Sequence, residues 1–414
     1  MNRRSLFLAL GLFTTKAMAQ PGVLPEDPRV DLNSGFRNTI SLTGRFDFNA
    51  NTVFNALPLA LYRGGYLESD LRQRSADALR DKGNSVGYQI EGRAQWTGAA
   101  CWTKHPTWRP LVSLAHHDLA GLSFTKDSYA LTFFGNAAYE GRTAVLAPSG
   151  FQQIRYQTIG AGIIAQESGS FVRLDLVRGQ SFAALDVGSA TLFTGEDGRV
   201  LRSSLLGDYA ASDTSGSGFD RMNGLGAAFS ARWATTTRGE RPVRFGFGVD
   251  DLGFLAWNGN SVSIDQDTLI RYEGWQVENL FALDDVIVNE ETVLDTLGLR
   301  YAHGATTRLL PFRVYADANM QVGAHWRLGL ALDHRHLPGY IPQLTILGSR
   351  VLGERTMLGG SLSYGGFGTL RVGVAAKRRF GERVLLSLST PQLAGFATGN
   401  VRGLGLVFGL NIGL

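Results

Sequence analysis

The sequence predicts an all-β protein, a single transmembrane antiparallel β-barrel of about 14 strands (range about 12–16) with two short helical insertions. Three observations predict this fold: an export signal at the N-terminus, repeated segments of alternating polarity, and the lack of a long apolar run after the signal. The composition agrees, because 52 of the 414 residues are glycine, well above the typical usage of about 7%.

Residues 1–19 have the three parts of a secretory signal peptide: a basic start at residues 2–4, an apolar stretch at 5–13, and an Ala-x-Ala cleavage site at 17–19. The apolar stretch is shorter than the roughly 20 residues that a membrane-spanning helix needs. We therefore expect export through the Sec pathway, and we expect residues 20–37 to form an N-terminal periplasmic segment.

Residues 38–414 carry the alternating pattern that predicts the barrel. At the C-terminus, Phe408, Leu410 and Ile412 alternate with Gly409 and Asn411, and similar segments begin near residues 40, 86, 243, 312 and 370. Neighbouring side chains of a strand point to opposite faces, so the apolar set is predicted to face lipid and the other set the lumen. The sheet must close, because lipid offers no partner for an unpaired backbone edge. The alternative is a soluble β-sandwich with one buried face.

Two stretches break the alternation and predict helical insertions near residues 66–82 and 284–297. In the first, Leu67, Leu71 and Leu79 recur at helical spacing and Gly83 ends the run. One hypothesis places this first helix as a hatch inside or across the barrel mouth, where its arginines would meet acidic residues of the lumen. The alternative, under a structural role, is an exposed docking element on the surface.

Five tryptophans lie near the ends of predicted strands, where a girdle at the membrane interface is expected. They are Trp96, Trp233, Trp257, Trp275 and Trp326.

Glycines line the lumen side of the last predicted strand and leave space there. Gly405, Gly409 and Gly413 therefore predict either a free volume or close approach by an inserted segment.

Charged residues of both signs fall on the side of the strands that is predicted to face the lumen. A lumen of one sign would indicate an ion-selective pore, whereas mixed signs favour internal ladders that hold a narrow or plugged barrel. The alternative is a solvated wall whose charges have no function. The lumen-facing candidates are Arg45, Asp47, Glu91, Arg93, Arg244, Asp250, Arg313 and Asp317.

Composition argues against several other functions. The formal net charge of +4 is too small and too dispersed for a nucleic-acid-binding protein. Cys101 is the only cysteine, which excludes an internal disulfide and a cysteine-based zinc site.

No catalytic residue, cofactor or metal site is predicted, and we do not expect an enzyme. His116 and His117 are adjacent in a strand and must point to opposite faces. His334 and His336 share a face, but that face continues the predicted lipid side. The string Gly179-Gln180-Ser181-Phe182-Ala183 lacks the last glycine of a nucleophile elbow and predicts a tight turn instead.

Several short strings, in a fixed order, resemble a family of Gram-negative outer-membrane barrels known only as a domain of unknown function. They are Phe124-Thr125-Lys126-Asp127, Phe133-Phe134-Gly135-Asn136, Val177-Arg178-Gly179-Gln180-Ser181-Phe182, Val249-Asp250-Asp251-Leu252-Gly253-Phe254 with Trp257-Asn258, Asp295-Thr296-Leu297 and Leu310-Pro311. The family is similar in architecture to long-chain fatty-acid transport barrels and to accessory barrels of type IX secretion and gliding. The resemblance implies the bacterial outer membrane as location and implies no established activity.

Two functions follow from this architecture as hypotheses. The first is passive transport of a small hydrophobic or amphipathic molecule, which a continuous apolar pocket inside the barrel would favour. The alternative is a structural or assembly role, in which the barrel anchors a surface or secretion machine. The expected partners are outer-membrane lipid together with that small molecule or that protein complex; nucleic acid is not expected.

Overall fold

The computed structural model describes residues 24, 29–32, 36–64, 67–100, 107–196, 198, 200–213, 216, 218–273 and 302–414, and for 265–273 only the backbone. The helical elements are α1 (Ala56–Arg63), α2 (Ser69–Asp77), α3 (Lys126–Phe134) and the short 3₁₀ turns η2 (Ala137–Tyr139) and η4 (Leu393–Phe396). The strands are β1 (Thr39–Ala50), β2 (Asn84–Thr97), β3 (Trp108–Phe124), β4 (Arg142–Val145), β5 (Ser149–Ala165), β6 (Phe171–Thr194), β7 (Leu201–Ala211), β8 (Gly224–Thr236), β9 (Val243–Trp257), β10 (Val262–Glu273), β11 (Ala302–His303), β12 (Thr306–Leu309), β13 (Arg313–Val322), β14 (Trp326–Arg335), β15 (Ile341–Leu352), β16 (Thr356–Gly366), β17 (Arg371–Phe380), β18 (Val384–Thr390) and β19 (Gly403–Gly413).

Fourteen of these strands close into an antiparallel barrel, which confirms the predicted fold. The ring runs β1-β2-β3-β5-β6-β8-β9-β13-β14-β15-β16-β17-β18-β19, and β19 pairs back with β1. Leu42 lies opposite Leu410 across the closing seam. Closure leaves the wall of the barrel without an edge, so its backbone donors and acceptors are paired within the sheet.

The predicted alternation of faces holds along the closing strand β19. Asn411 is buried on the inner side, whereas Leu406 on the outer side is 40% exposed. Space left by the glycines is filled as the sequence suggested: a Cβ on Gly413 would lie 2.4 Å from the ring of Phe36. The last strand therefore presents large apolar side chains outward and small residues to segments inside the barrel.

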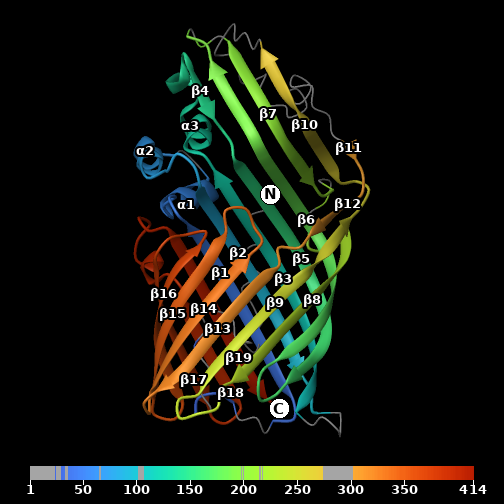
Figure 1. Ribbon diagram of the computed structural model, residues 1–414, viewed down its shortest axis with the longest axis vertical. Coiled ribbons are helices and arrows are strands. Elements are labelled where there is room, and N and C mark those ends of the chain that lie inside the picture. Colours follow the sequence, from blue (N-terminus) through green and yellow to red (C-terminus); the bar gives the residue numbers. More distant parts are fainter. Residues whose placement is uncertain are drawn as a thin grey trace.

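The two ends of the barrel differ (Figure 1). At the lower end, which holds Leu414, three-residue turns at 323–325, 353–355 and 381–383 join neighbouring strands. At the upper end the connections are longer and carry α1, α2 and α3. Bacterial outer-membrane barrels have this asymmetry, with short turns on the periplasmic side and long loops on the outer side.

One side of the barrel continues upward as a small sheet (Figure 1). Strand β6 is 24 residues long; its lower half pairs with β8 in the barrel, and its upper half pairs with β4 and β7. Strand β10 pairs with β7 beyond it. The upper sheet is thus an extension of the wall that stands above the mouth.

A β-bulge connects the two halves of β6. Pairing with β5 passes from Tyr156 opposite Gly179 to Arg155 opposite Ser181, which leaves Gln180 as the extra residue. The tight turn that the sequence predicted here is therefore wrong, because the strand continues through the bulge. An extra residue reverses the facing of the side chains beyond it.

The helices lie outside the barrel wall (Figure 1). The predicted insertion at 66–82 contains the shorter helix α2, and α1 and α3 were not predicted. Leu67 and Leu71 pack against the same apolar cluster as Val86 and Leu122, which are on the outer face of β2 and β3. The hatch hypothesis is therefore not met: these leucines cover the outside of the upper rim, where the wall offers them apolar partners. The predicted insertion at 284–297 lies outside the described residues.

The described part of the N-terminal segment lies within the lower end of the barrel. Leu24 and Val30 are buried against Val351, Met357 and Leu385 of the inner wall. Leu24 and Val30 of the predicted periplasmic segment therefore lie in the lumen, because these apolar side chains find a surface there that water does not provide.

The tryptophan girdle forms at one end only among the described residues. Trp96, Trp233 and Trp326 are 40%, 50% and 51% exposed near the lower ends of their strands. Trp257 is 2% exposed and packs inside the upper mouth, so its predicted interfacial position is wrong. Trp275 lies outside the described residues. None of the described helices is long and apolar enough to cross a membrane.

Candidate functional site

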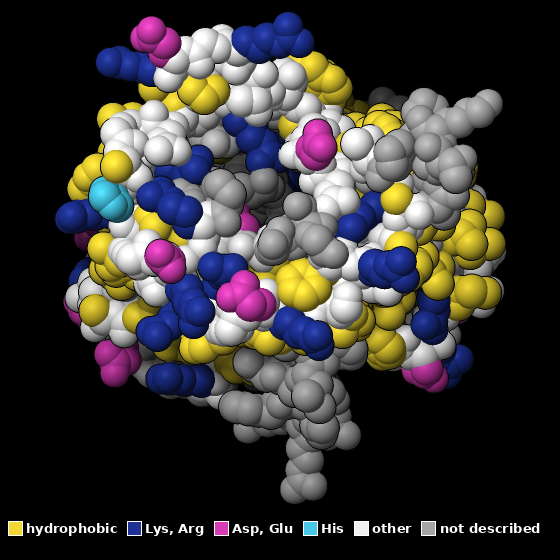
Figure 2. Space-filling model, turned by 90° about the horizontal axis from the view of Figure 1, so that it is seen from below, with side chains coloured by type: hydrophobic (Ala, Val, Ile, Leu, Met, Phe, Trp, Pro, Cys, Tyr) yellow, Lys and Arg dark blue, Asp and Glu magenta, His cyan; other side chains and the backbone are white. Residues whose placement is uncertain are grey.

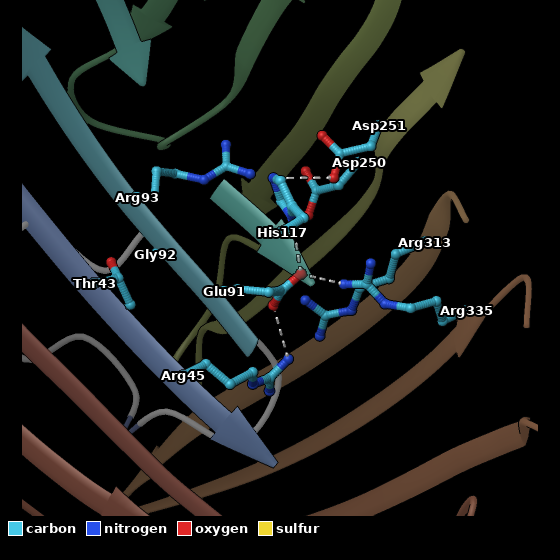
Figure 3. Close-up of a pocket in the computed structure, with 10 residues that line it drawn as sticks. All are labelled: Thr43, Arg45, Glu91, Gly92, Arg93, His117, Asp250, Asp251, Arg313 and Arg335. Atoms are coloured by element: carbon cyan, nitrogen blue, oxygen red, sulfur yellow. Dashed lines mark hydrogen bonds and ion pairs between the residues drawn. The ribbon is translucent and has the colours of Figure 1, made fainter. Parts of the chain in front are cut away.

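A polar pocket lies in the lumen between the apolar upper mouth and the N-terminal segment (Figure 3). From below, the molecule is hollowed at its centre; Lys, Arg, Asp and Glu side chains gather around the hollow, and hydrophobic ones lie on the flanks (Figure 2). Its centre has room for about one water molecule. The pocket is lined by Thr43, Arg45, Glu91, Gly92, Arg93, His117, Asp250, Asp251, Arg313 and Arg335.

Glu91 is the centre of the network (Figure 3). Its carboxylate lies 2.7 Å from Arg335 Nη2, 3.3 Å from His117 Nδ1 and 3.7 Å from Arg45 Nη1. Going round the ring from β2 to β14 takes seven steps (β3, β5, β6, β8, β9, β13, β14), so Arg335 lies on the opposite wall. Eight strands give a barrel that side chains fill, and 16–18 leave an aqueous channel. In this 14-stranded barrel, the contact between opposite walls closes the middle of the lumen.

Asp250 and Asp251 reach the same pocket from a second bulge. Between β8 and β9, Phe229 pairs with Leu252 and Ala231 with Val249, so two aspartates face the single residue Ser230. Asp251 has φ 58°, a left-handed conformation that aspartate tolerates better than most residues. The bulge thus lets two consecutive acids enter the lumen between outward-facing Val249 and Leu252.

Arg173 and Ser230 hold this bulge in place. The backbone N–H of Asp251 donates to Ser230 Oγ at 3.0 Å, and Arg173 Nη2 donates to the same oxygen at 3.1 Å. Arg173 is almost fully buried and is paired with Asp175 at 2.8 Å. A buried guanidinium needs such a carboxylate partner, because removing an unpaired charge from water is costly.

His117 lies between two carboxylates. Its Nδ1 is 3.3 Å from Glu91, its Nε2 is 3.9 Å from Asp251, and its ring stacks on Tyr156 at 4.5 Å between centroids. The hydroxyl of Tyr156 donates to Asp251 at 3.4 Å. Asp251 Oδ1 and His117 Nε2 are both buried and have no hydrogen-bond partner in the described structure.

The predicted lumen residues do not all meet in one place. Arg45, Glu91, Arg93, Asp250 and Arg313 line the pocket. They come from β1, β2, β9 and β13, whose inner faces converge at this height.

The other three lie elsewhere on the inner wall. Asp47 pairs with Arg371 at 2.9 Å, and Asp317 pairs with Arg232 at 2.7 Å. Arg244 is near the lower end of the barrel, where it donates to the carbonyl of Ser168 at 2.6 Å. The charges thus form separate ion pairs along the lumen, with the pocket residues as the largest group.

Sequence reasoning missed five of the ten pocket residues, three of which are titratable: His117, Asp251 and Arg335. The inward facing of His117 and Arg335 follows from the alternation of their strands, which places His116 and His334 outside. Asp251 has a subtler signal: Phe245, Phe247 and Val249 alternate in one phase, and Leu252, Phe254 and Ala256 in the other. A change of phase within one strand indicates a bulge between the two runs.

An apolar cluster closes the upper mouth directly above the pocket. Part of it comes from the wall, including Tyr156 and Trp257, and part from three upper connections that carry Leu310, Tyr340 and Phe367. The loop residues cross to the far wall, since a Cβ on Gly87 of β2 would lie 2.3 Å from the ring of Phe367. The ring of Tyr340 packs in the apolar cluster, whereas its hydroxyl donates to Asp333 at 3.0 Å. The buried members are Leu119, Ile154, Tyr156, Val177, Phe182, Ala210, Ala228, Leu255, Trp257, Leu310, Leu337, Tyr340 and Phe367.

The acidic side chains of the pocket have arginine neighbours. Within the described ranges, no three His, Cys, Asp or Glu side chains converge as metal ligands. The carboxylates here are instead interleaved with four arginines, which supply the positive charge that a cation would otherwise supply.

Comparison with known proteins gave one family and several structures. A family model described as "Family of unknown function (DUF5723)" matches residues 176–385, and the chain belongs to this family. No curated protein matches. Solved structures similar to the chain include a deletion mutant of the TodX monoaromatic hydrocarbon channel (TM-score 0.43, 9% identity, 92% of this chain and 91% of that chain covered) and the toluene transporter TodX of Pseudomonas putida (TM-score 0.39, 8%, 91% and 89%). Another is the translocator domain of the autotransporter NalP from Neisseria meningitidis (TM-score 0.35, 8%, 92% and 90%).

Proposed function

We propose that this member of the DUF5723 family is a bacterial outer-membrane barrel that passes a small amphipathic molecule through a lumen closed at rest. The observation that carries the proposal is the layering of the interior, where an apolar cluster lies directly on a charged pocket. Tyr156 belongs to both layers, because its ring packs in the cluster and its hydroxyl contacts Asp251. A molecule with an apolar body and a polar head matches such an interior.

The outer surface supports the membrane location. Leu174, Ile159 and Phe247 are 67%, 57% and 58% exposed on the outside of the barrel. Large apolar surfaces of this kind are unfavourable in contact with water. The three exposed tryptophans mark the lower edge of this belt.

Polar contacts mark the upper edge of the apolar belt on the outside of the barrel. On the outer face of β2, β3 and β5, the hydroxyl of Tyr88 donates to Asp118 at 3.0 Å, Asp118 pairs with Arg155 at 2.7 Å, and Gln153 donates to Tyr88 at 2.7 Å. The belt between these edges is the part of the wall that we assign to lipid.

Connections between strands carry part of the apolar cluster that closes the upper mouth. Leu310, Leu337 and Phe367 lie in connections between strands, whereas the wall they cover is continuous sheet. Loops change conformation at lower cost than paired strands. Displacing these connections would expose Tyr156 and Trp257 to an entering molecule and give its polar end access to the pocket.

Fluorescence of Trp257 tests this proposal. A variant that keeps Trp257 as the only tryptophan is placed in lipid nanodiscs and titrated with 10-bromodecanoate, whose bromine quenches a nearby indole. Entry into the barrel should quench Trp257 more strongly than Trp233 in a matched variant, since Trp233 meets only probe dissolved in the lipid. Equal or weaker quenching of Trp257 would contradict transport through this mouth.

An accessory role in a surface assembly is the second candidate. The observation in its favour is that the wall extends above the barrel as a sheet with α3 beside it, while ion pairs connect opposite walls in the middle of the lumen. This reading predicts an unquenched Trp257 and recovery of a protein complex when the full chain is isolated from outer membranes. Loss of that complex on deletion of residues 195–213 of the upper sheet would support it.

A further inference from the structure

Two neighbouring helices on the outside of the upper rim have opposite surfaces. Helix α1 reads ALPLALYR; Arg63 is its only charged residue, and its Leu61 and Tyr62 are 53% and 67% exposed. Helix α2 reads SDLRQRSAD and exposes polar and charged side chains such as Gln73. A helix with this apolar exposed face is unfavourable in water, so the two helices are suited to different surroundings.

The apolar face of α1 continues onto η4. In η4, Leu393 and Phe396 are 49% and 59% exposed. Hydrogen bonds join the start of α1 to the connection that carries η4: the N–H of Ala56 donates to the carbonyl of Gly399 at 3.1 Å. We call α1 and η4 together the rim collar.

The rim collar is continuous with the outer apolar belt of the barrel. A Cβ on Gly395 would lie 3.2 Å from the Leu404 side chain of β19, so η4 rests directly on the wall. The N–H of Val372 in β17 donates to the side-chain oxygen of Gln392, just before η4, at 3.3 Å. Val372 and Leu406 are 54% and 40% exposed on the same outer face.

One basic side chain lies beside the start of α1. Arg402 covers the ring of Phe54 at 4.8 Å and donates to the carbonyl of Asn51 at 3.0 Å. Burial, and then the nearby positive charge of Arg80, lower the pKa of Arg402. An apolar face with an arginine beside it suits the boundary between acyl chains and phosphate-bearing headgroups.

We propose that the rim collar is a lipid-binding element that lies in the outer leaflet, with Leu61, Tyr62 and Phe396 among the acyl chains. The proposal rests on the membrane location proposed above and adds to it a helix that the leaflet covers. The collar widens the contact between protein and lipid on the side where the barrel wall is low, and α2 lies in water beside it.

An environment-sensitive fluorophore tests the collar. In a Cys101→Ser background, Leu61→Cys, Gln73→Cys and Leu174→Cys are each labelled with a nitrobenzoxadiazole dye and reconstituted into phosphatidylcholine–phosphatidylglycerol vesicles without other protein. We expect the dye at position 61 to shift its emission to the blue by about half or more of the shift at position 174, and brominated lipid to quench both. The dye at 73 should emit as in water.

The outcomes separate the two proposals. A water-like dye at 61 together with a lipid-like dye at 174 would overturn the collar and leave the barrel in the membrane. A water-like dye at 174 would overturn the membrane location itself. Tyr62→Cys, at another exposed position of α1, repeats the measurement should the dye at 61 disturb the helix.

Discussion

Glu91 and Arg335 are 244 residues apart in the chain, and their side chains meet at 2.7 Å across the lumen. Each lies on the inner face of a strand, and the two strands are on opposite walls of the ring. This pair bridges the lumen of the barrel at mid-height. Loss of either partner should lower the stability of the barrel, because both side chains are largely removed from water.

Replacing one partner of this pair should destabilise the barrel strongly. Arg335→Ala leaves Glu91 short of its nearest cation, and breaking a buried ion pair in this way costs about 3–5 kcal/mol. Urea-induced unfolding in liposomes, followed by the gel shift of the folded barrel, measures the change. The control is Arg355→Ala, which breaks an exposed pair with Glu382 at 3.8 Å and should cost less than about 1 kcal/mol. Similar losses for both variants would contradict the assigned role of Arg335.

Two leucines on the outer side of β6 test the height of the lipid belt. Leu174 is 67% exposed below the bulge, and Leu185 is 39% exposed above it. Leu174→Arg should cost about 2–4 kcal/mol, the penalty for arginine near the bilayer midplane. Leu185→Arg should cost about 1 kcal/mol or less, because an arginine at the polar edge of a bilayer or in water stays hydrated. Folding titrations in liposomes compare them, and equal penalties would show that the belt is misplaced.

The conformation of Asp251 predicts which substitutions the bulge accepts. At φ 58°, asparagine is tolerated and a β-branched residue is strained. Asp251→Val should therefore be less stable than Asp251→Asn by about 1–3 kcal/mol. Asp250 does not have a positive φ. The same two substitutions at Asp250 therefore provide the control for lost charge and polarity. A stability difference between the valine and asparagine variants that is as large at position 250 as at position 251 would mean that backbone strain is not the cause.

The N-terminal segment should be released by a charge at its most buried side chain. Val30 is fully buried among Val351, Met357 and Leu385, so Val30→Asp removes the apolar contact that holds the segment in the lumen. Trypsin should then cleave after Arg29 much faster than in the unmodified chain, while the barrel keeps its gel shift. Val30→Ala, which leaves only a small cavity, should stay protected. Rapid cleavage of the unmodified chain would contradict docking of the segment.

The sequence by itself determined the class of fold, a strand number of about 14 (range about 12–16) and the faces of most strands. Leu410 and Asn411 illustrate the reason: side chains alternate with a period of two, and a wall between lipid and lumen needs different residues on its two sides. Those constraints act on neighbouring residues of one strand, so a single sequence displays them. The inward sides of Glu91, Arg313 and Asp317 could be predicted in the same way.

Only the tertiary structure decided which inward residues meet. That Arg335 reaches Glu91, while Asp317 pairs with Arg232, depends on strand order, stagger and the two bulges. The apolar stripe of Leu67 and Leu71 fits a lumen hatch and an outer cover equally well, because burial of leucine is favourable in both. Its position was decided by the apolar outer side of β2 and β3, which includes Val86. Local polarity fixes the face of a side chain, whereas its partner depends on distances between segments that the sequence pattern does not contain.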